Sequence, residues 1–197
     1  MLSRKEDYSS HDAANRVALL ARENLQLQAR VAELERLTAM DTLTPLFNRR
    51  YLMQELDRWC WRAHRYGGTF GLLYLDVDRL KSVNDTHGHT AGDAVLCAIA
   101  EALGNATRKS DVIARMGGDE FAVLLDSISA EKLAEKMNSV RRMLTGLAVP
   151  ITGSTLQIDV SVGCSLIESG SRASEVLIEA DRAMYADKRS KYGEAVG

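Results

Sequence analysis

RMGGDEFAVLL, residues 115–125, places two glycines and two carboxylates between two apolar segments. Apolar residues on both sides of a Gly-Gly pair are typical of a β-hairpin. Glycine adopts positive φ angles readily and lets a bulky ligand approach the backbone. The pattern therefore predicts strands at 111–115 and 121–125, with Asp119 and Glu120 at the tip of the hairpin between them.

A second buried strand is predicted at TFGLLYLD, residues 69–76, which is followed by Val77 and Asp78. If this strand neighbours the hairpin, Asp76 and Glu120 converge from adjacent strand ends. Carboxylates brought so close repel each other unless a cation joins them. Oxygen ligands of this kind suit Mg²⁺, which usually keeps several waters and binds substrate phosphates as well. The alternative interpretation is that the acidic tip serves only solubility.

Polar residues suited to a nucleotide follow in KSVNDTHGHTAGD, residues 81–93. Lys81 is a candidate cation for phosphate. Asn84 and Asp93 are candidate partners for a base, because a carboxylate can accept both hydrogens on the Watson–Crick edge of guanine and an amide can donate to its acceptors. The alternative is that Asn84 and Asp93 are ordinary turn or cap residues.

Composition excludes several classes of protein. The chain has 197 residues, of which 46% are hydrophobic and 26% charged, with a net charge of −2 and a pI of about 6.1. This balance does not favour a nucleic-acid partner. Cys60, Cys97 and Cys164 form no CxxC pair, which argues against a disulfide framework or a zinc site. No apolar run reaches membrane-span length and no leader is visible, so we expect a soluble, cytoplasmic protein.

The chain divides near residue 41 into a polar, flexible N-terminus at 1–12, a helix at 13–40 and a domain at 41–197. The helix carries apolar residues at alternating spacings of three and four, which predicts a dimeric coiled coil. An Asn at one of these core positions favours a defined register and a parallel dimer. The alternative is a single amphipathic helix packed on its own domain. The predicted seam consists of Val17, Leu20, Asn24, Leu27, Val31 and Leu34.

Helices and strands mix after residue 41, which predicts an α/β (α+β) domain with a mainly antiparallel sheet flanked by helices. Besides the three strands above, one more is expected at 155–166. The predicted helices span 48–66, 90–105, 129–147 and 172–191, with a loop or short helix between 77 and 89.

Several motifs together resemble the GGDEF family of diguanylate cyclases. The resemblance runs from Asp41 to about Gly193 and rests on motifs that occur in the family's order and spacing. It implies a palm-like fold and condensation of two GTP molecules into cyclic di-GMP with release of two pyrophosphates. The matching segments are DTLTPLFNRR at 41–50, DVD at 76–78, Lys81, ND at 84–85, GH at 88–89, GD at 92–93, RMGGDEF at 115–121, SVG at 161–163 and ADRAMYADK at 180–188.

The resemblance also implies roles for individual residues. Two Mg²⁺ ions, or Mn²⁺ in their place, would be held by Asp76, the Val77 carbonyl and Glu120, and Asp119 would be a catalytic or metal-contacting carboxylate. Asn84 and Asp93 would bind guanine. The phosphates would contact Lys81 and Lys188 and enter over Gly117 and Gly118.

Each domain of this family holds one GTP, so the resemblance implies a homodimer and gives the predicted coiled coil a purpose. Arg108 and Asp111 form an RxxD motif just before the hairpin, the place of the family's inhibitory site for cyclic di-GMP. Planar Arg suits phosphate and guanine, and Asp accepts from guanine. The sequence does not name the input signal. Either an unidentified partner binds the N-terminal helix, or the enzyme is regulated only by dimerisation and product.

The sequence departs from the family after Lys188, where RSKYGEAVG stands in place of the usual Gly-Arg-Asn. Arg189 and Lys191 are the candidates to replace the missing phosphate contact. The rival function is a catalytically silent receptor that binds GTP or cyclic di-GMP and signals through its coiled coil. Two further hypotheses are an interaction module with vestigial GTP binding and a cyclase that forms a different cyclic product.

Overall fold

The computed structural model describes residues 16–17, 20–28, 30 and 39–193. These residues belong to two units, divided between Ala39 and Met40. In the first unit all the described residues before Ala39 are helical. Four predicted seam positions, Val17, Leu20, Asn24 and Leu27, lie in this part. The predicted seam residues Val31 and Leu34, and the predicted flexible segment 1–12, lie outside the described residues.

A five-stranded sheet forms the centre of the second unit, in the order β1-β3-β4-β2-β7. Only β1 and β3 pair in parallel, so the predicted mainly antiparallel sheet is confirmed. A separate hairpin pairs β5 with β6. The bounds are β1 Phe47–Asn48, β2 Phe70–Val77, β3 Val112–Gly117, β4 Glu120–Leu125, β5 Leu147–Ile151, β6 Ser154–Ile158 and β7 Val160–Ile167.

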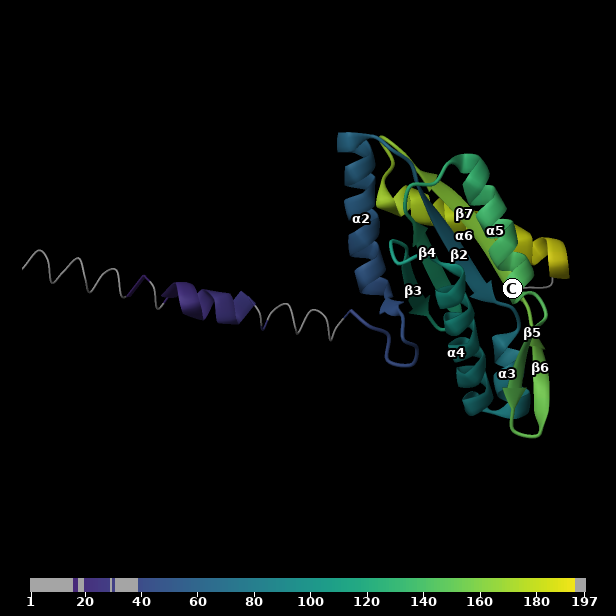
Figure 1. Ribbon diagram of the computed structural model, residues 1–197. Helices are drawn as coiled ribbons and strands as arrows, with labels where there is room; N and C mark the ends of the chain where they lie inside the picture. The colour runs from purple at the N-terminus through teal and green to yellow at the C-terminus, as the bar shows by residue number, and fades with distance from the viewer. Residues whose placement is uncertain (1–15, 18–19, 29, 31–38, 194–197) are drawn as a thin grey trace, which may run out of the picture. The chain divides into compact units, whose positions relative to one another are not determined.

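Helices cover both faces of this sheet (Figure 1). Helices α2 (Arg49–Tyr66) and α6 (Ala173–Tyr192) pack on one face. Helices α4 (His89–Ala106) and α5 (Ala130–Leu144) pack on the other, and the short α3 (Leu80–His87) follows β2 directly. No helix in the described part of the chain has both the length and the apolar character needed to cross a membrane.

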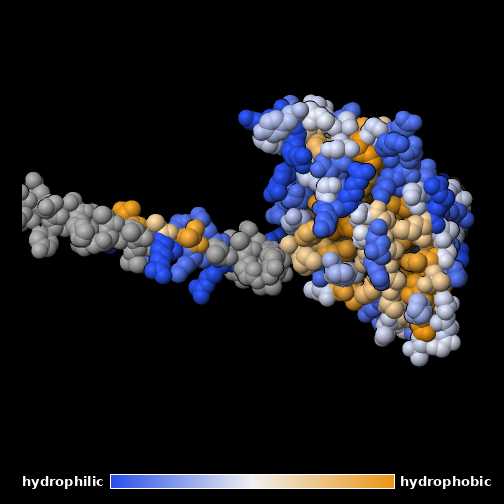
Figure 2. All heavy atoms as spheres, viewed as in Figure 1, coloured by the Kyte–Doolittle hydropathy of each residue, from blue (hydrophilic) through white to orange (hydrophobic). Residues whose placement is uncertain are grey.

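Strand β2 is the centre of the core, because all eight of its residues are buried. Successive side chains of a strand point to opposite faces. Leu73 and Leu75 therefore join the core under α4 and α5, while Leu72 and Tyr74 join the core under α2 and α6. Figure 2 shows mainly polar residues on the outer surface of α2, as expected for a helix that buries one side only.

The predicted single strand at 155–166 is wrong, since the chain changes sheets at Asp159. The Asp159 carbonyl accepts the Asp78 amide at 2.9 Å, and its carboxylate accepts the Gly146 amide at 3.2 Å. The residues before it pair with β5 and those after it pair with β2.

Sequence analysis also missed two strands. Strand β1 is too short to show alternation, and β5 contains Pro150. Proline is tolerated there because β5 has a partner on one side only.

Helix α6 approaches β7 closely at Gly163. A Cβ atom at this position would lie 2.1 Å from the Met184 nitrogen and 2.2 Å from the Ala180 oxygen. Both are backbone atoms, so only a displacement of the helix could make room. Glycine is therefore required where α6 crosses the sheet.

We predict that Gly163→Ala lowers the free energy of unfolding by roughly 1–3 kcal/mol or more, because overpacking forces backbone shifts. Urea denaturation measures the change. Gly104→Ala in α4 is the matched control, since a Cβ there meets no heavy atom within 4 Å. Alanine should stabilise that helix by about 0.5–1 kcal/mol. An unchanged midpoint for Gly163→Ala would contradict the close packing.

Candidate active site

Asp76 and Glu120 lie opposite each other on β2 and β4, which confirms that the two predicted strands are neighbours. The Val77 amide donates to the Asp119 carbonyl at 3.0 Å and fixes the hairpin tip against the end of β2. Gly117 pairs with Glu120, so the tip itself consists of Gly118 and Asp119. The acidic residues of the two segments therefore meet at one edge of the sheet.

The backbone of the tip depends on its glycines. Gly117 has φ 139° and Gly118 has φ 52°, and a Cβ on either would meet no atom within 4 Å. The tip is thus open to a ligand, and its conformation disfavours other residues. Arg115 holds it, donating to the Gly118 carbonyl at 3.1 Å through Nε and at 2.7 Å through Nη2. A further Arg115 contact reaches Asp41 at 3.3 Å. Sequence analysis did not assign this role to Arg115.

Asp76 accepts a hydrogen bond from Lys188 Nζ at 2.6 Å, and its side chain is 12% exposed. Burial raises the pKa of Asp76 to about 6 even though Lys188 opposes the shift, and the charges of Asp119 and Asp78 add to it. Burial also works against the charge of Lys188, but the bond to Asp76 and the neighbouring carboxylates raise the pKa of Lys188 overall. This end of β2 therefore carries a surplus of negative charge.

Asp78 is buried in a polar network on the same edge. Its carboxylate accepts from Ser161 Oγ at 2.7 Å, Lys191 Nζ at 3.3 Å and the Tyr192 hydroxyl at 3.4 Å. Lys191 also pairs with Asp187 at 3.3 Å. Asp78 therefore connects the end of β2 to the last turn of α6, and Lys191 is already engaged by two carboxylates.

The oxygen donors at this edge suit a divalent cation that arrives with a nucleotide. Among the residues described, no three His, Cys, Asp or Glu side chains form a ready metal cage. Asp76 and Glu120 supply two carboxylates and Val77 a backbone carbonyl, and Mg²⁺ commonly binds one or two carboxylates plus substrate phosphates.

Tyr74, to which sequence analysis gave no role, hydrogen bonds to Glu120. Burial and the Glu120 charge raise the pKa of Tyr74, so its hydroxyl remains a donor.

A cavity of about 500 Å³ opens beside the hairpin tip, between α3 and α4. Asn84 Oδ1 is buried there without a hydrogen-bond partner among the described residues. A Cβ on Gly92 would lie 2.0 Å from that oxygen, so glycine makes room for the Asn84 amide. An unpaired buried polar atom indicates a missing partner. The predicted residues that line this cavity are Lys81, Asn84, Asp93, Gly118 and Asp119.

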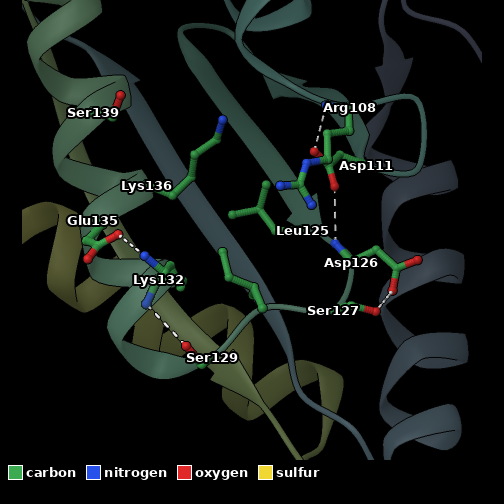
Figure 3. A pocket seen from close by; sticks show the side chains of 11 residues that line it. Arg108, Asp111, Leu125, Asp126, Ser127, Ser129, Lys132, Glu135, Lys136 and Ser139 are labelled. Atoms are coloured by element: carbon green, nitrogen blue, oxygen red, sulfur yellow. Dashed lines mark hydrogen bonds and ion pairs between the residues drawn. The ribbon is translucent and has the colours of Figure 1, made fainter.

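A second cavity, of about 350 Å³, contains the RxxD pair (Figure 3). The Asp111 carboxylate accepts the Arg108 amide at 2.8 Å and the Asp126 amide at 3.2 Å. These bonds order the loop, while the Arg108 guanidinium extends into the cavity in Figure 3. Lys132 and Lys136 of α5 lie across from it. The predicted inhibitory residues thus line one cavity, separate from the first, where the cations Arg108, Lys132 and Lys136 stand among the carboxylates of Asp111, Asp126 and Glu135.

The family profile described as "Diguanylate cyclase, GGDEF domain" matches residues 38–194. The chain is 39% identical over 150 residues to the diguanylate cyclase DgcP of Pseudomonas aeruginosa, covering 76% of this chain and 22% of that protein. It is 36% identical over 172 residues to the diguanylate cyclase TpbB of the same organism, covering 85% of this chain and 39% of that protein. The chain thus spans well under half the length of these relatives.

Two solved structures are similar to this chain over most of its length. The crystal structure of diguanylate cyclase SiaD with its activator SiaC, from Pseudomonas aeruginosa, has a TM-score of 0.75 and 36% identity and covers 96% of this chain and 74% of that one. The coiled coil and GGDEF domain of DgcB from Caulobacter crescentus, in complex with c-di-GMP, has a TM-score of 0.77 and 31% identity. It covers 89% of this chain and 93% of that one.

Proposed function

The chain belongs to the diguanylate cyclase, GGDEF domain family, and from this membership we propose that it condenses two GTP molecules into cyclic di-GMP and two pyrophosphates. One observation carries the proposal: Asp76 and Glu120 lie directly opposite each other on the neighbouring strands β2 and β4. They do so beside a cavity that contains Asn84 and Asp93. Metal-binding carboxylates next to a polar base pocket are what a nucleotidyl-transfer site requires.

Guanine would enter the cavity between α3 and α4. The Asp93 carboxylate can accept both donors on the Watson–Crick edge, and the Asn84 amide can pair with the remaining polar groups of the base. Lys81 and the open backbone of Gly117 and Gly118 would face the phosphates. The base contacts orient the nucleotide, which is the main task of the protein in phosphoryl-transfer chemistry.

Asp76, Glu120 and the Val77 carbonyl would hold two Mg²⁺ ions, or Mn²⁺ in their place, with Asp119 as a further catalytic or metal-contacting carboxylate. Bound metal would stabilise the negative charge of the transferring phosphate and lower the pKa of the attacking 3′-hydroxyl. The surplus negative charge at the end of β2 supports this role. With a cation at Asp76, Lys188 would no longer be needed as its ion-pair partner and could contact phosphate.

The reaction joins two GTP molecules, and one site of this kind holds one of them, so two domains must face each other. We assign their association to the N-terminal helix. Its predicted seam residues Val17, Leu20 and Leu27 are exposed by 67%, 56% and 59% in the single chain. Burying such a stripe in a parallel coiled coil would keep two domains at high local concentration. The similar structure of DgcB contains a coiled coil beside its GGDEF domain.

We also propose the N-terminal helix as the binding place of a regulatory partner. The similar cyclase SiaD was solved in complex with its activator SiaC, which is consistent with a protein partner but does not locate it. A dimeric parent, stripped of bound cyclic di-GMP, that forms no product would favour either such a partner or the silent receptor. Binding of GTP or cyclic di-GMP by this inactive dimer, with no gain of activity in cell extract, would favour the receptor.

The proposed reaction predicts that Glu120→Gln lowers cyclic di-GMP formation by at least about 100-fold, because it removes a charged metal ligand without changing side-chain size. Purified chain is incubated with GTP and Mg²⁺, and the products are identified by chromatography and mass spectrometry. Glu101→Gln, at an exposed position on α4, is the control and should match the parent. Parental activity in Glu120→Gln would refute the assigned site.

The proposed coiled coil predicts that replacing Leu20, Leu27 and Leu34 together by Ser yields monomers. Their cyclase activity should be lost at low protein concentration and partly recovered at high concentration, since encounter of two half-sites then limits the rate. Sedimentation velocity and rate measurements over a dilution series test this. Monomers with full activity per chain would rule the mechanism out.

We further propose that cyclic di-GMP inhibits the enzyme by binding at Arg108 and Asp111, since the Arg108 guanidinium can bind phosphate or guanine in the second cavity. Arg108→Ala should raise the product concentration needed for half-inhibition by roughly tenfold or more, the loss of a hydrogen bond to a charged group. Lys109→Ala is the control, because Lys109 lies in the same loop but does not line that cavity. Unchanged inhibition in Arg108→Ala would contradict the assignment.

A further inference from the structure

We propose that Arg79 binds the phosphates of the substrate and that Tyr192 positions the Arg79 guanidinium for this contact. The inference rests on the proposed function and identifies a phosphate-binding residue within the same site. It concerns two residues to which sequence analysis gave no role.

Arg79 occupies a special backbone position at the edge where the carboxylates meet. It directly follows Asp76, Val77 and Asp78 and stands at the N-cap of α3, with φ 60° and ψ 26°. Only one other described non-glycine residue, Ser127, has a positive φ. A left-handed conformation costs an ordinary residue about 1–2 kcal/mol, and such strain concentrates at functional sites. A glycine here would avoid this cost, so we infer that the arginine side chain serves a function that offsets it.

The guanidinium of Arg79 stacks on the aromatic ring of Tyr192, 4.4 Å from the ring centroid. The Tyr192 hydroxyl is in turn bonded to the buried Asp78 carboxylate at 3.4 Å. Within the described residues Arg79 forms no ion pair. Stacking on a ring leaves the edges of the guanidinium available as donors. Arg79 is thus an oriented cation whose N–H groups are not used by a carboxylate.

The position of Tyr192 locates this cation near the proposed metal site. Tyr192 and Lys188 stand four residues apart on α6, and residues at this spacing lie on the same face of a helix. Lys188 pairs with Asp76 at 2.6 Å. Arg79 therefore lies at the same edge of the sheet as Lys188, the edge to which the proposed function assigns the metal ligands.

Two other cations at this edge are held by carboxylates in the described structure. Lys188 pairs with Asp76 and Lys191 pairs with Asp78 and Asp187. Lys191, one of the candidates to replace the missing C-terminal contact, is thus held by two carboxylates. Arg79 supplies a cation from a different segment, and its planar fork fits two phosphate oxygens at once.

Equilibrium binding to the full chain, freed of bound nucleotide, tests the inference. The probes are guanosine 5′-(α,β-methylene)triphosphate, which cannot be cleaved between its α- and β-phosphates, and GMP, each with Mg²⁺ in a calorimeter. Arg79→Gly removes the guanidinium, and glycine accepts the backbone conformation without strain. We expect it to weaken binding of the triphosphate roughly tenfold or more, while GMP affinity changes less than about twofold. Arg79→Lys should restore part of the loss.

Variants of Tyr192 test the positioning role. Tyr192→Phe keeps the ring and should bind the triphosphate as the parent does. Tyr192→Leu removes the ring and should weaken triphosphate binding by roughly two- to fivefold, the usual worth of an exposed cation–π contact.

Three results would overturn the inference. Arg79→Gly could bind the triphosphate as tightly as the parent does. It could instead bind the triphosphate and GMP more weakly by the same factor, which would indicate a change of shape in the base pocket. A parent that binds neither nucleotide would contradict the proposed function, and the inference would fall with it. If the parent binds both nucleotides and Arg79→Gly binds them with the parent's affinities, the inference about Arg79 is wrong while the proposed function stands.

Discussion

The antiparallel register that places Asp76 opposite Glu120 is the constraint on which the rest of the site depends. Strand β2 is buried on both faces, and each of its apolar side chains belongs to one of the two cores. A slip of one residue would exchange the two faces and move every side chain into the wrong core. Apolar packing along the whole strand therefore holds two carboxylates together at its end.

Helix α6 contributes both to the packing of the domain and to the candidate site. The helix packs against β7 at Gly163, where no Cβ can be accommodated. This close approach brings Lys188 to Asp76, and Lys191 and Tyr192 to Asp78. The buried acids at the end of β2 would be costly without these partners. Even so, burial keeps the pKa of Asp76 raised. The partners thus compensate the negative charge at the end of β2 only in part, as the proposed metal site requires.

Much of this could be read from the sequence because the decisive signals are local. A Gly-Gly pair between apolar segments predicted the hairpin, and a continuous apolar run predicted β2. The change of sheets at Asp159 could not be predicted, since it depends on bonds to Asp78 and Gly146. The contacts of Arg115 with Asp41 and of Arg79 with Tyr192 span long stretches of chain and likewise leave no periodic signal. The roles proposed for Asn84 and Asp93 rest on the family resemblance more than on their spacing.

We propose that Asp76 and Glu120 form one metal site, which a bound nucleotide completes. The most direct test is electron paramagnetic resonance of Mn²⁺ titrated into the full chain, with and without guanosine 5′-(α,β-methylene)triphosphate. We expect the parent to bind Mn²⁺ tightly only when nucleotide is present, and we expect Asp76→Asn and Glu120→Gln to bind it at least about tenfold more weakly. Equal uptake by the parent and both variants would contradict it.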